Sequence, residues 1–412
     1  MKKVCNFCGR NENEVKLLIT GINGYICEQC AAQAYDIVQS TGILGADGKS
    51  KGKKTAFKLG KVPKPLEIKN YLDQYVIGQD DAKRSLAVAV YNHYKRLSQK
   101  EDTDGVEIEK SNIIMVGSTG TGKTLLARTI AKLLDVPFTI VDATVFTEAG
   151  YVGEDVESIL SRLLQVADFD QAAAERGIVF IDEVDKIARK SDNPSITRDV
   201  SGEGVQQSLL KLLEGSIVNV PPKGGRKHPD QDYIHLDTKN ILFICGGAFD
   251  GIERKIAQRL NTHVVGYNSV QNVRNIDKED LMKYIMPQDL KSFGLIPEII
   301  GRLPVLTYLN PLDRAALRKI LIEPKNSIIK QYEKLFQMDG IKLTFPENTL
   351  DYMVDRAIEY KLGARGLRSI VESVMTDAMF EMPSKRVKAF EVSLDYTKAQ
   401  LDKAHLQKLE SA

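Results

Sequence analysis

Short apolar runs alternate with longer segments of helical character across the middle of the chain. Runs of four or five apolar residues suit strands that are buried on both faces of a parallel sheet. Residues 125–131, by contrast, have the composition of a helix. This alternation between residues 66 and 310 predicts an α/β domain with a parallel sheet and helices on both faces. The strands are expected at residues 112–116, 138–142, 178–181, 241–245 and 305–309.

Helical character dominates after residue 312. Helices are predicted at residues 313–336, 348–360 and 365–380, with one strand at 341–345. The change predicts a second, smaller, mainly helical α/β domain. We place a large domain at residues 65–310, a small domain at 311–396 and a C-terminal tail at 397–412.

Residues 41–64 are rich in glycine and lysine and carry few apolar anchors. Such a composition is typical of a flexible linker. Its lysines would also suit phosphate binding, but a solvated tether is the interpretation we favour. The linker separates the large domain from an N-terminal module at residues 1–40.

Four of the five cysteines lie in that module, as two C-x2-C pairs separated by eighteen residues. This spacing is typical of a zinc site, and four sulfur ligands make the metal structural rather than catalytic. A disulfide framework is the alternative, and it fits less well because only four cysteines cluster and a cytoplasmic location is expected. Zinc would stabilise a module that is too small to fold alone. The ligands are Cys5, Cys8, Cys27 and Cys30, and residues 31–38 predict a short helix for dimer or partner contacts.

Composition and charge limit the class of protein. With 412 residues, 43% of them hydrophobic, the chain has enough apolar side chains for two or three packed domains. No apolar run approaches the length of about 18 residues that a membrane span needs, and the first residues lack the apolar segment of a signal peptide. We therefore expect a cytoplasmic protein without a membrane partner. The 57 basic and 55 acidic residues give a net charge of +2, which provides no overall attraction to nucleic acid.

A glycine-rich turn, Gly-Ser-Thr-Gly-Thr-Gly-Lys-Thr, follows the first apolar run and precedes a helical segment. Strand, glycine-rich turn and helix in this order are the context of a P-loop, whose backbone N–H groups bind phosphate. Lys123 would contact the β- and γ-phosphates, and the Thr124 hydroxyl would bind Mg²⁺. A chance glycine turn is the alternative. The predicted contacts with a nucleoside triphosphate are Ser118, Thr119, Gly120, Thr121, Gly122, Lys123 and Thr124.

Two adjacent carboxylates, Asp182 and Glu183, end the apolar run at residues 178–181. Two carboxylates at the end of a buried strand are costly to place without a cation. We expect Asp182 to assist the Mg²⁺ shell and Glu183 to polarise the attacking water. Solvated acids in an exposed turn are the alternative, which the nearby P-loop makes the weaker one.

Together these parts resemble the AAA+ ATPases, and further segments resemble the Clp/HSP100 protein unfoldases over essentially the whole chain. The resemblance implies a P-loop large domain, a small helical lid domain and a preceding zinc domain that dimerises. It also implies a homohexameric chaperone that uses ATP to unfold tagged proteins and delivers them to the ClpP peptidase, with adaptor proteins as further partners. The segments are the four-cysteine N-terminus and residues 72–79, 150–153, 226–228, 265–267 and 363–368.

The resemblance assigns two segments to an axial pore. Tyr151 and Val152, between two glycines, would grip an extended polypeptide, although a locally packed loop is an equal possibility from the residues alone. Arg226, Lys227 and His228 would attract substrate tails at the pore entrance. A solvated turn or a nucleic-acid finger are the alternatives for these three. Residues 191–204 match a second pore loop.

The long segment 261–275 carries Val265, Gly266 and Tyr267. Exposed apolar residues on such a loop suggest docking into a partner's pocket. The resemblance implies that this partner is ClpP. The family usually has Ile-Gly-Phe at these positions, so this chain has a smaller aliphatic residue and an added hydroxyl.

Two arginines and two apolar residues complete the site that the resemblance implies. Arg302 matches an arginine finger that enters a neighbouring subunit's site, and Arg365 matches a residue that senses the γ-phosphate. Val76 and Ile77 match residues beside the adenine, although by pattern alone they suit an ordinary core. Ser118 stands where the family often has proline, and no residue is assigned to the first sensor position.

The leading hypothesis is an ATPase that unfolds proteins and is not itself a protease, because no G-x-S-x-G nucleophile motif is present. One alternative is an AAA+ nucleic-acid motor or loader whose zinc module binds DNA. Another is a zinc-dependent scaffold in which nucleotide only maintains shape. The near-neutral charge argues against the first alternative, and Glu183 with Arg302 argues against the second.

Overall fold

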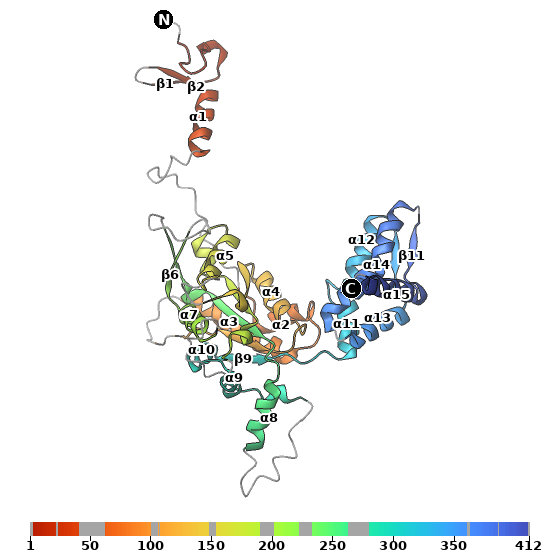
Figure 1. Ribbon diagram of the computed structural model, residues 1–412. Helices are drawn as coiled ribbons and strands as arrows, with labels where there is room; N and C mark the ends of the chain where they lie inside the picture. The colour runs from red at the N-terminus through yellow and green to blue at the C-terminus, as the bar shows by residue number, and fades with distance from the viewer. Residues whose placement is uncertain are drawn as a thin grey trace. The chain divides into compact units, whose positions relative to one another are not determined.

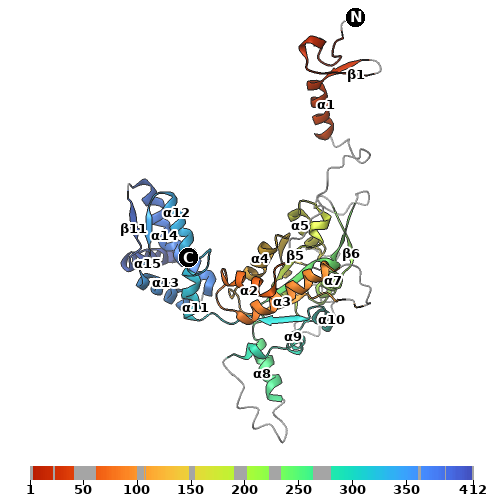
Figure 2. The ribbon, with the colours of Figure 1, turned by 180° about the vertical axis from the view of Figure 1, so that it is seen from behind.

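The computed structural model describes most of the chain, in two compact units that we treat separately, Met1–Lys58 and Leu59–Ala412 (Figures 1 and 2). The described residues are 3–21, 24–40, 62–99, 106, 108–147, 154–189, 202–221, 233–262, 280–360, 363–385 and 387–410. None of the helices in these ranges combines the length and the apolarity needed to cross a bilayer.

The second unit is built on a parallel sheet of five strands in the order β4-β5-β8-β3-β9. Each strand begins within one residue of the apolar run that predicts it, which confirms the α/β fold with a parallel sheet. The strands are β3 (Ile113–Val116), β4 (Phe138–Asp142), β5 (Ile178–Asp182), β8 (Leu242–Gly247) and β9 (Val305–Tyr308).

Both faces of the sheet are buried. Successive side chains of each strand point to opposite faces, so burial of consecutive residues shows that both faces are covered. On one face, Met115, Phe180 and Ile244 pack in a core with the helices α2 (Pro65–Asp73), α3 (Asp80–Leu97) and α4 (Lys123–Leu134). The alternate residues Ile114, Val179 and Phe243 are also fully buried. The all-apolar strands are therefore explained by cover on two sides.

The remaining elements of the large domain connect the strands. Strands β6 (Ile217–Val220) and β7 (Ile234–Asp237) pair antiparallel in a separate two-stranded sheet. The helices are α5 (Ser158–Val166), α6 (Gln171–Ala174), α7 (Glu203–Glu214), α8 (Ile252–Thr262), α9 (Pro287–Phe293) and α10 (Pro297–Gly301), with short 3-10 turns η2 (Ala143–Val145), η3 (Val184–Ile187), η4 (Thr238–Asn240) and η6 (Leu281–Tyr284).

The residues from 312 onward have a hydrophobic core of their own. The single helix predicted at residues 313–336 is wrong: Pro324 has no N–H to donate and separates α11 (Arg314–Ile322) from α12 (Ile328–Met338). α13 (Glu347–Glu359) and α14 (Gly363–Glu381) follow, and β10 (Lys342–Thr344) pairs in parallel with β11 (Ala389–Glu391). The last helix, α15 (Leu394–Glu410), crosses the boundary between the predicted small domain, which ends at residue 396, and the predicted tail, which begins at residue 397.

The first unit is small and contains few elements. The 3-10 turn η1 (Glu12–Glu14) precedes a hairpin of β1 (Leu18–Thr20) and β2 (Tyr25–Cys27). Helix α1 (Glu28–Ser40) follows directly and includes the helix predicted at residues 31–38.

Candidate active site

The glycine-rich turn joins the end of β3, which lies between β8 and β9 in the sheet, to the start of α4. Gly120 and Gly122 have φ angles of +85° and +107°. Side chains with a Cβ rarely adopt this region, so glycine is required at both positions. Gly122 is the N-cap of α4, which directs the free N–H groups of the first helical turn into the loop.

Lys123 lies almost entirely inside this turn, with 8% of the residue exposed. Its Nζ donates hydrogen bonds to the carbonyl oxygens of Gly117 and Ser118. Burial lowers the pKa of Lys123, and the carboxylates of Asp182 and Asp185 oppose that effect. The ammonium group is therefore fixed where a phosphate can replace the loop carbonyls as its partner.

The two carboxylates at the end of β5 have different surroundings. Asp182 accepts a hydrogen bond at 3.1 Å from the Thr124 hydroxyl and another from the backbone N–H of Glu183. Glu183 is exposed and has a φ of +56°, a left-handed conformation that turns the chain sharply after the strand. A hydroxyl and a carboxylate oxygen side by side are ligands that Mg²⁺ prefers.

These groups line one pocket of about 530 Å³. The P-loop and the end of β5 contribute one side of it, and Arg365 and Arg368 of α14 also line it. The structure thus brings together Thr119, Gly120, Gly122, Lys123, Thr124, Asp182, Glu183 and Arg365, all of which were predicted from the sequence. Ser118 and Thr121 belong to the same turn, and the Thr121 hydroxyl donates to the Ser118 carbonyl oxygen.

Four charged residues in the pocket were missed by the sequence reasoning. Asp185 is 6% exposed and accepts a hydrogen bond at 3.1 Å from the N–H of Ala248, just after β8. Lys186 forms an ion pair with it at 3.3 Å. Asp250 and Arg368 also line the pocket. Asp185 and Arg368 could have been found from the sequence, because each lies within a few residues of a predicted site residue. Asp250 lies shortly after the end of β8, the strand for which no polar site residue was predicted.

Val76 lies against the P-loop: a Cβ placed on Gly122 would be 4.0 Å from its Cγ1. Val76 is 5% exposed and Ile77 is partly exposed. An apolar wall beside the glycine turn is compatible with a flat heterocyclic base.

Arg302 is the one predicted catalytic residue that does not line this pocket. It caps the C-terminus of α10, and its guanidinium forms an ion pair with Glu214 at 2.9 Å. The pore and docking predictions cannot be placed, because Tyr151, Val152, Arg226, Lys227, His228, Val265, Gly266 and Tyr267 lie outside the described residues. The same holds for residues 41–61 of the linker and for residues 191–201.

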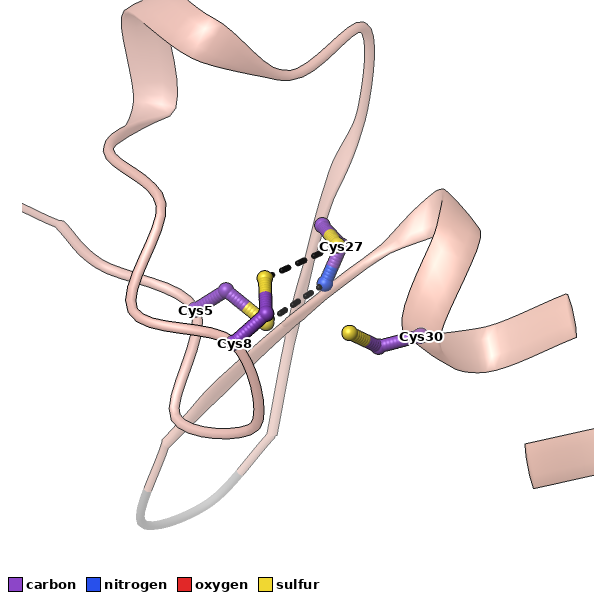
Figure 3. A group of neighbouring side chains, drawn as sticks. All are labelled: Cys5, Cys8, Cys27 and Cys30. Carbon is purple, nitrogen blue, oxygen red and sulfur yellow. Dashed lines mark hydrogen bonds between the residues drawn. The ribbon is translucent and has the colours of Figure 1, made fainter. Parts of the chain in front are cut away.

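The first unit brings its four cysteines together from three places in the chain (Figure 3). Cys5 and Cys8 come from the first loop, Cys27 ends β2 and Cys30 lies in the first turn of α1. Their four Sγ atoms all lie within 4.8 Å of one another, and all four cysteines are free. This donor set fits a closed tetrahedral zinc site.

The surroundings shift the pKa values of two of these thiols in opposite directions. Burial acts to raise the pKa of Cys5, but hydrogen bonds from the backbone of Cys8, Cys27 and Phe7 lower it to about 6. A hydrogen bond with Cys8, together with burial, raises the pKa of Cys30 to about 12. Thiolates whose Sγ atoms lie within 4.8 Å of one another repel, so a cation would be needed to balance four of them.

Three family models match the chain. The "ClpX C4-type zinc finger" matches residues 3–40, the "AAA domain (Cdc48 subfamily)" matches residues 108–306, and the "C-terminal, D2-small domain, of ClpB protein" matches residues 312–393. The matched ranges include the cysteine cluster, the P-loop with the end of β5, and the small domain with Arg365.

Curated relatives cover the whole chain. A protein of Bacteroides fragilis named "ATP-dependent Clp protease ATP-binding subunit ClpX" is 75% identical over 411 residues, which are 100% of this chain and 98% of the relative. A protein of the same name from Bacteroides thetaiotaomicron is 74% identical over 411 residues, covering 100% and 99%. Another, from Porphyromonas gingivalis, is 67% identical over 402 residues, covering 97% of each.

Proposed function

The chain belongs to the ClpX family of AAA ATPases, and from this premise we propose that it is an ATP-dependent unfoldase that delivers proteins to the ClpP peptidase. Its cofactors are ATP, Mg²⁺ and Zn²⁺. The observation that carries the proposal is the single pocket in which Lys123, Asp182, Glu183 and Arg365 meet.

Each residue of the pocket has a proposed role in hydrolysis. The P-loop N–H groups and Lys123 bind the phosphates, while Thr124 and Asp182 hold the metal. Glu183 lies at the exposed end of β5 and orients the attacking water. When bound, ATP with Mg²⁺ supplies the phosphoryl group and neutralises part of its charge. Val76 and Ile77 pack beside the base.

Arg365 and Arg368 connect nucleotide binding to the small domain. Both lie on α14, which belongs to the core of residues 312 onward, whereas the P-loop belongs to the large domain. Contacts of these guanidinium groups with phosphate would change when the γ-phosphate is lost. We propose that this change moves the small domain and so couples hydrolysis to mechanical work.

We propose that the active form is a homohexamer, because Arg302 lies outside the pocket of its own chain. A half-exposed arginine at a helix end can enter a neighbouring subunit's pocket and stabilise the charge on the transferred phosphoryl group. Tyr151, Val152, Arg226, Lys227 and His228 are proposed to grip the substrate in the pore of that ring.

The remaining parts of the proposal concern partners and location. Val265, Gly266 and Tyr267 follow α8 and are proposed to dock onto ClpP. The zinc module is proposed to dimerise and to recruit adaptors that bring tagged substrates. A cytoplasmic location agrees with four free cysteines arranged for zinc, since such thiols persist in reducing compartments.

The test is ATP-dependent loss of fluorescence from a tagged, stably folded fluorescent protein, with wild type compared with Glu183→Gln. We expect loss with ATP and not with ADP, only in wild type, and irreversibly when ClpP is present. Glu183→Gln should bind ATP and fail to unfold the substrate. ATP turnover without unfolding under several tags, together with salt-sensitive DNA binding, would favour the nucleic-acid motor instead.

A further inference from the structure

Arg302 is held by one carboxylate. Its Nε and Nη2 both donate to Oε1 of Glu214, at 3.1 and 2.9 Å. The two side chains are 53% and 43% exposed, and an ion pair this exposed adds little to stability. Its main physical effect is on orientation: it occupies one edge of the guanidinium and leaves Nη1 for another acceptor.

The buried side chain of Asn112, which is 1% exposed, hydrogen-bonds to the backbone at or next to both residues of this ion pair. Its Nδ2 donates to the carbonyl oxygens of Arg302 at 2.9 Å and Leu213 at 3.1 Å, and its Oδ1 accepts from the N–H of Phe243. One buried amide thus joins the residue before Glu214 to Arg302 itself. Asn112 immediately precedes β3, the strand that ends in the P-loop.

The other end of α10 is joined to α7 as well. Gln206 of α7 is fully buried, and its Oε1 accepts a hydrogen bond at 2.8 Å from the N–H of Ile296, the N-cap of α10. The five-residue helix α10 is therefore tied to α7 at both ends, by Gln206 at the start and by Glu214 at the finish. With the backbone held in this way, the orientation of the Arg302 side chain depends on Glu214.

We propose that Glu214 is a positioning residue for hydrolysis in the neighbouring subunit. Glu214 holds the Arg302 side chain in the rotamer that presents Nη1 to the phosphate bound in the neighbouring subunit. The Arg302 side chain therefore loses less conformational entropy when the site between the subunits closes. The inference rests on the proposed role of Arg302 as a finger that acts between subunits. The guanidinium keeps its charge in the pair, because arginine is not deprotonated in proteins.

Steady-state ATPase assays of the full-length protein test this with four variants. Glu214→Ala should lower kcat roughly tenfold, a small part of the 10³-fold or more that an arginine finger supplies, and leave KM for ATP unchanged. Glu214→Gln keeps an oxygen acceptor and should recover most of that loss. Glu298→Ala removes an exposed glutamate one helical turn from Arg302, with no ion pair to it in the described structure, and should behave as wild type. Arg302→Ala should lower kcat at least as much as Glu214→Ala.

Mixed rings show on which subunit Glu214 acts. Glu183→Gln subunits do not hydrolyse ATP but carry an intact Arg302 and Glu214, so adding them should raise the rate per Glu214→Ala subunit. If the ATPase rate per Glu214→Ala subunit stays constant or falls, Glu214 acts on the nucleotide pocket of its own subunit, and the proposal would be wrong.

Different results would contradict the role of Arg302 and the role of Glu214. If Arg302→Ala keeps the wild-type kcat, the proposed finger itself is wrong. If Arg302→Ala is slow while Glu214→Ala matches Glu298→Ala, the finger stands and the role of Glu214 is overturned. A thermal melt of each variant, with Glu214→Gln as the milder change, separates these results from misfolding.

Discussion

The Thr124 hydroxyl lies 3.1 Å from Oδ2 of Asp182 and so joins the first turn of α4 to the end of β5. The two residues are 58 positions apart in the chain, yet their oxygens are already side by side. A magnesium ion would find both ligands preorganised, with little rearrangement of either element.

Lys123→Ala should abolish ATPase activity by removing the ammonium group from the P-loop. The loss of about 3 kcal/mol of charged hydrogen bonding corresponds to roughly 100-fold weaker nucleotide binding. Titration with a fluorescent ATP analogue measures this. Lys132→Ala, an exposed lysine on the same helix, is the matched control and should bind as wild type. Equal affinity for the two variants would contradict the assigned phosphate site.

Gly246→Ala should destabilise the large domain by about 1–3 kcal/mol, because there is no space for a methyl group. A Cβ at this position would lie 2.7 Å from Cζ of Phe180, which is fully buried and cannot move aside. Gly301→Ala is the control, since nothing lies within 4 Å of its Cβ position. Urea denaturation compares the two, and similar midpoints would show that β5 and β8 adapt more readily than their packing indicates.

His93 should make the protein less stable as the pH falls. It is 1% exposed, and its Nε2–H donates to the Asn240 carbonyl oxygen at 3.1 Å. Burial, with a smaller effect of Arg96 and Lys110, lowers the pKa of His93 to about 3. Between pH 6.5, the ordinary value, and about 3 the unfolded chain binds the extra proton, so stability is lost on acidification by up to about 1.4 kcal/mol per pH unit.

Replacement of His93 by leucine should flatten that dependence. Unfolding free energies of wild type and His93→Leu, measured at pH 7, 6 and 5, should differ in slope. His235 is exposed, and His235→Leu should keep the wild-type slope. A parallel shift of the His93→Leu data, without a change in slope, would refute the assignment.

Removal of zinc should unfold the first unit and leave the ATPase intact. The cysteine cluster lies within Met1–Lys58, whereas the P-loop pocket lies in the other unit. Chelation or Cys8→Ser should make residues 3–40 sensitive to protease and reduce the metal content from one zinc per chain. Cys245→Ser, in the buried strand β8, should keep the zinc. A zinc-free protein that loses ATPase activity when assayed with excess Mg²⁺ would show that the two units depend on each other.

The strands and the central pocket were predictable because local sequence determines them. All-apolar runs next to a glycine-rich turn specify buried parallel strands and a phosphate loop, and the cysteine spacing specifies a metal site. The error at residues 313–336 had a visible cause, since Pro324 interrupts an otherwise helical pattern.

The missed parts of the site depend on contacts between distant segments. Asp185 meets Ala248 across 63 residues, and Asn112 meets Arg302 across 190. The residues next to Asp185 and Asn112 in the sequence do not indicate which distant residue each will contact. The pairing follows from the order of the strands, in which β3 lies between β8 and β9 and β5 is on the other side of β8.

The position of Arg302 outside its own pocket also has a consequence for the cell. We expect a newly synthesised chain to load nucleotide as soon as it folds and then to remain idle, since the arginine finger that we propose for hydrolysis belongs to another copy. Rapid ATP hydrolysis would thus begin only when rings form. The specific ATPase activity of a dilute preparation would fall as rings dissociate. Assembly itself would then be the switch that turns the motor on.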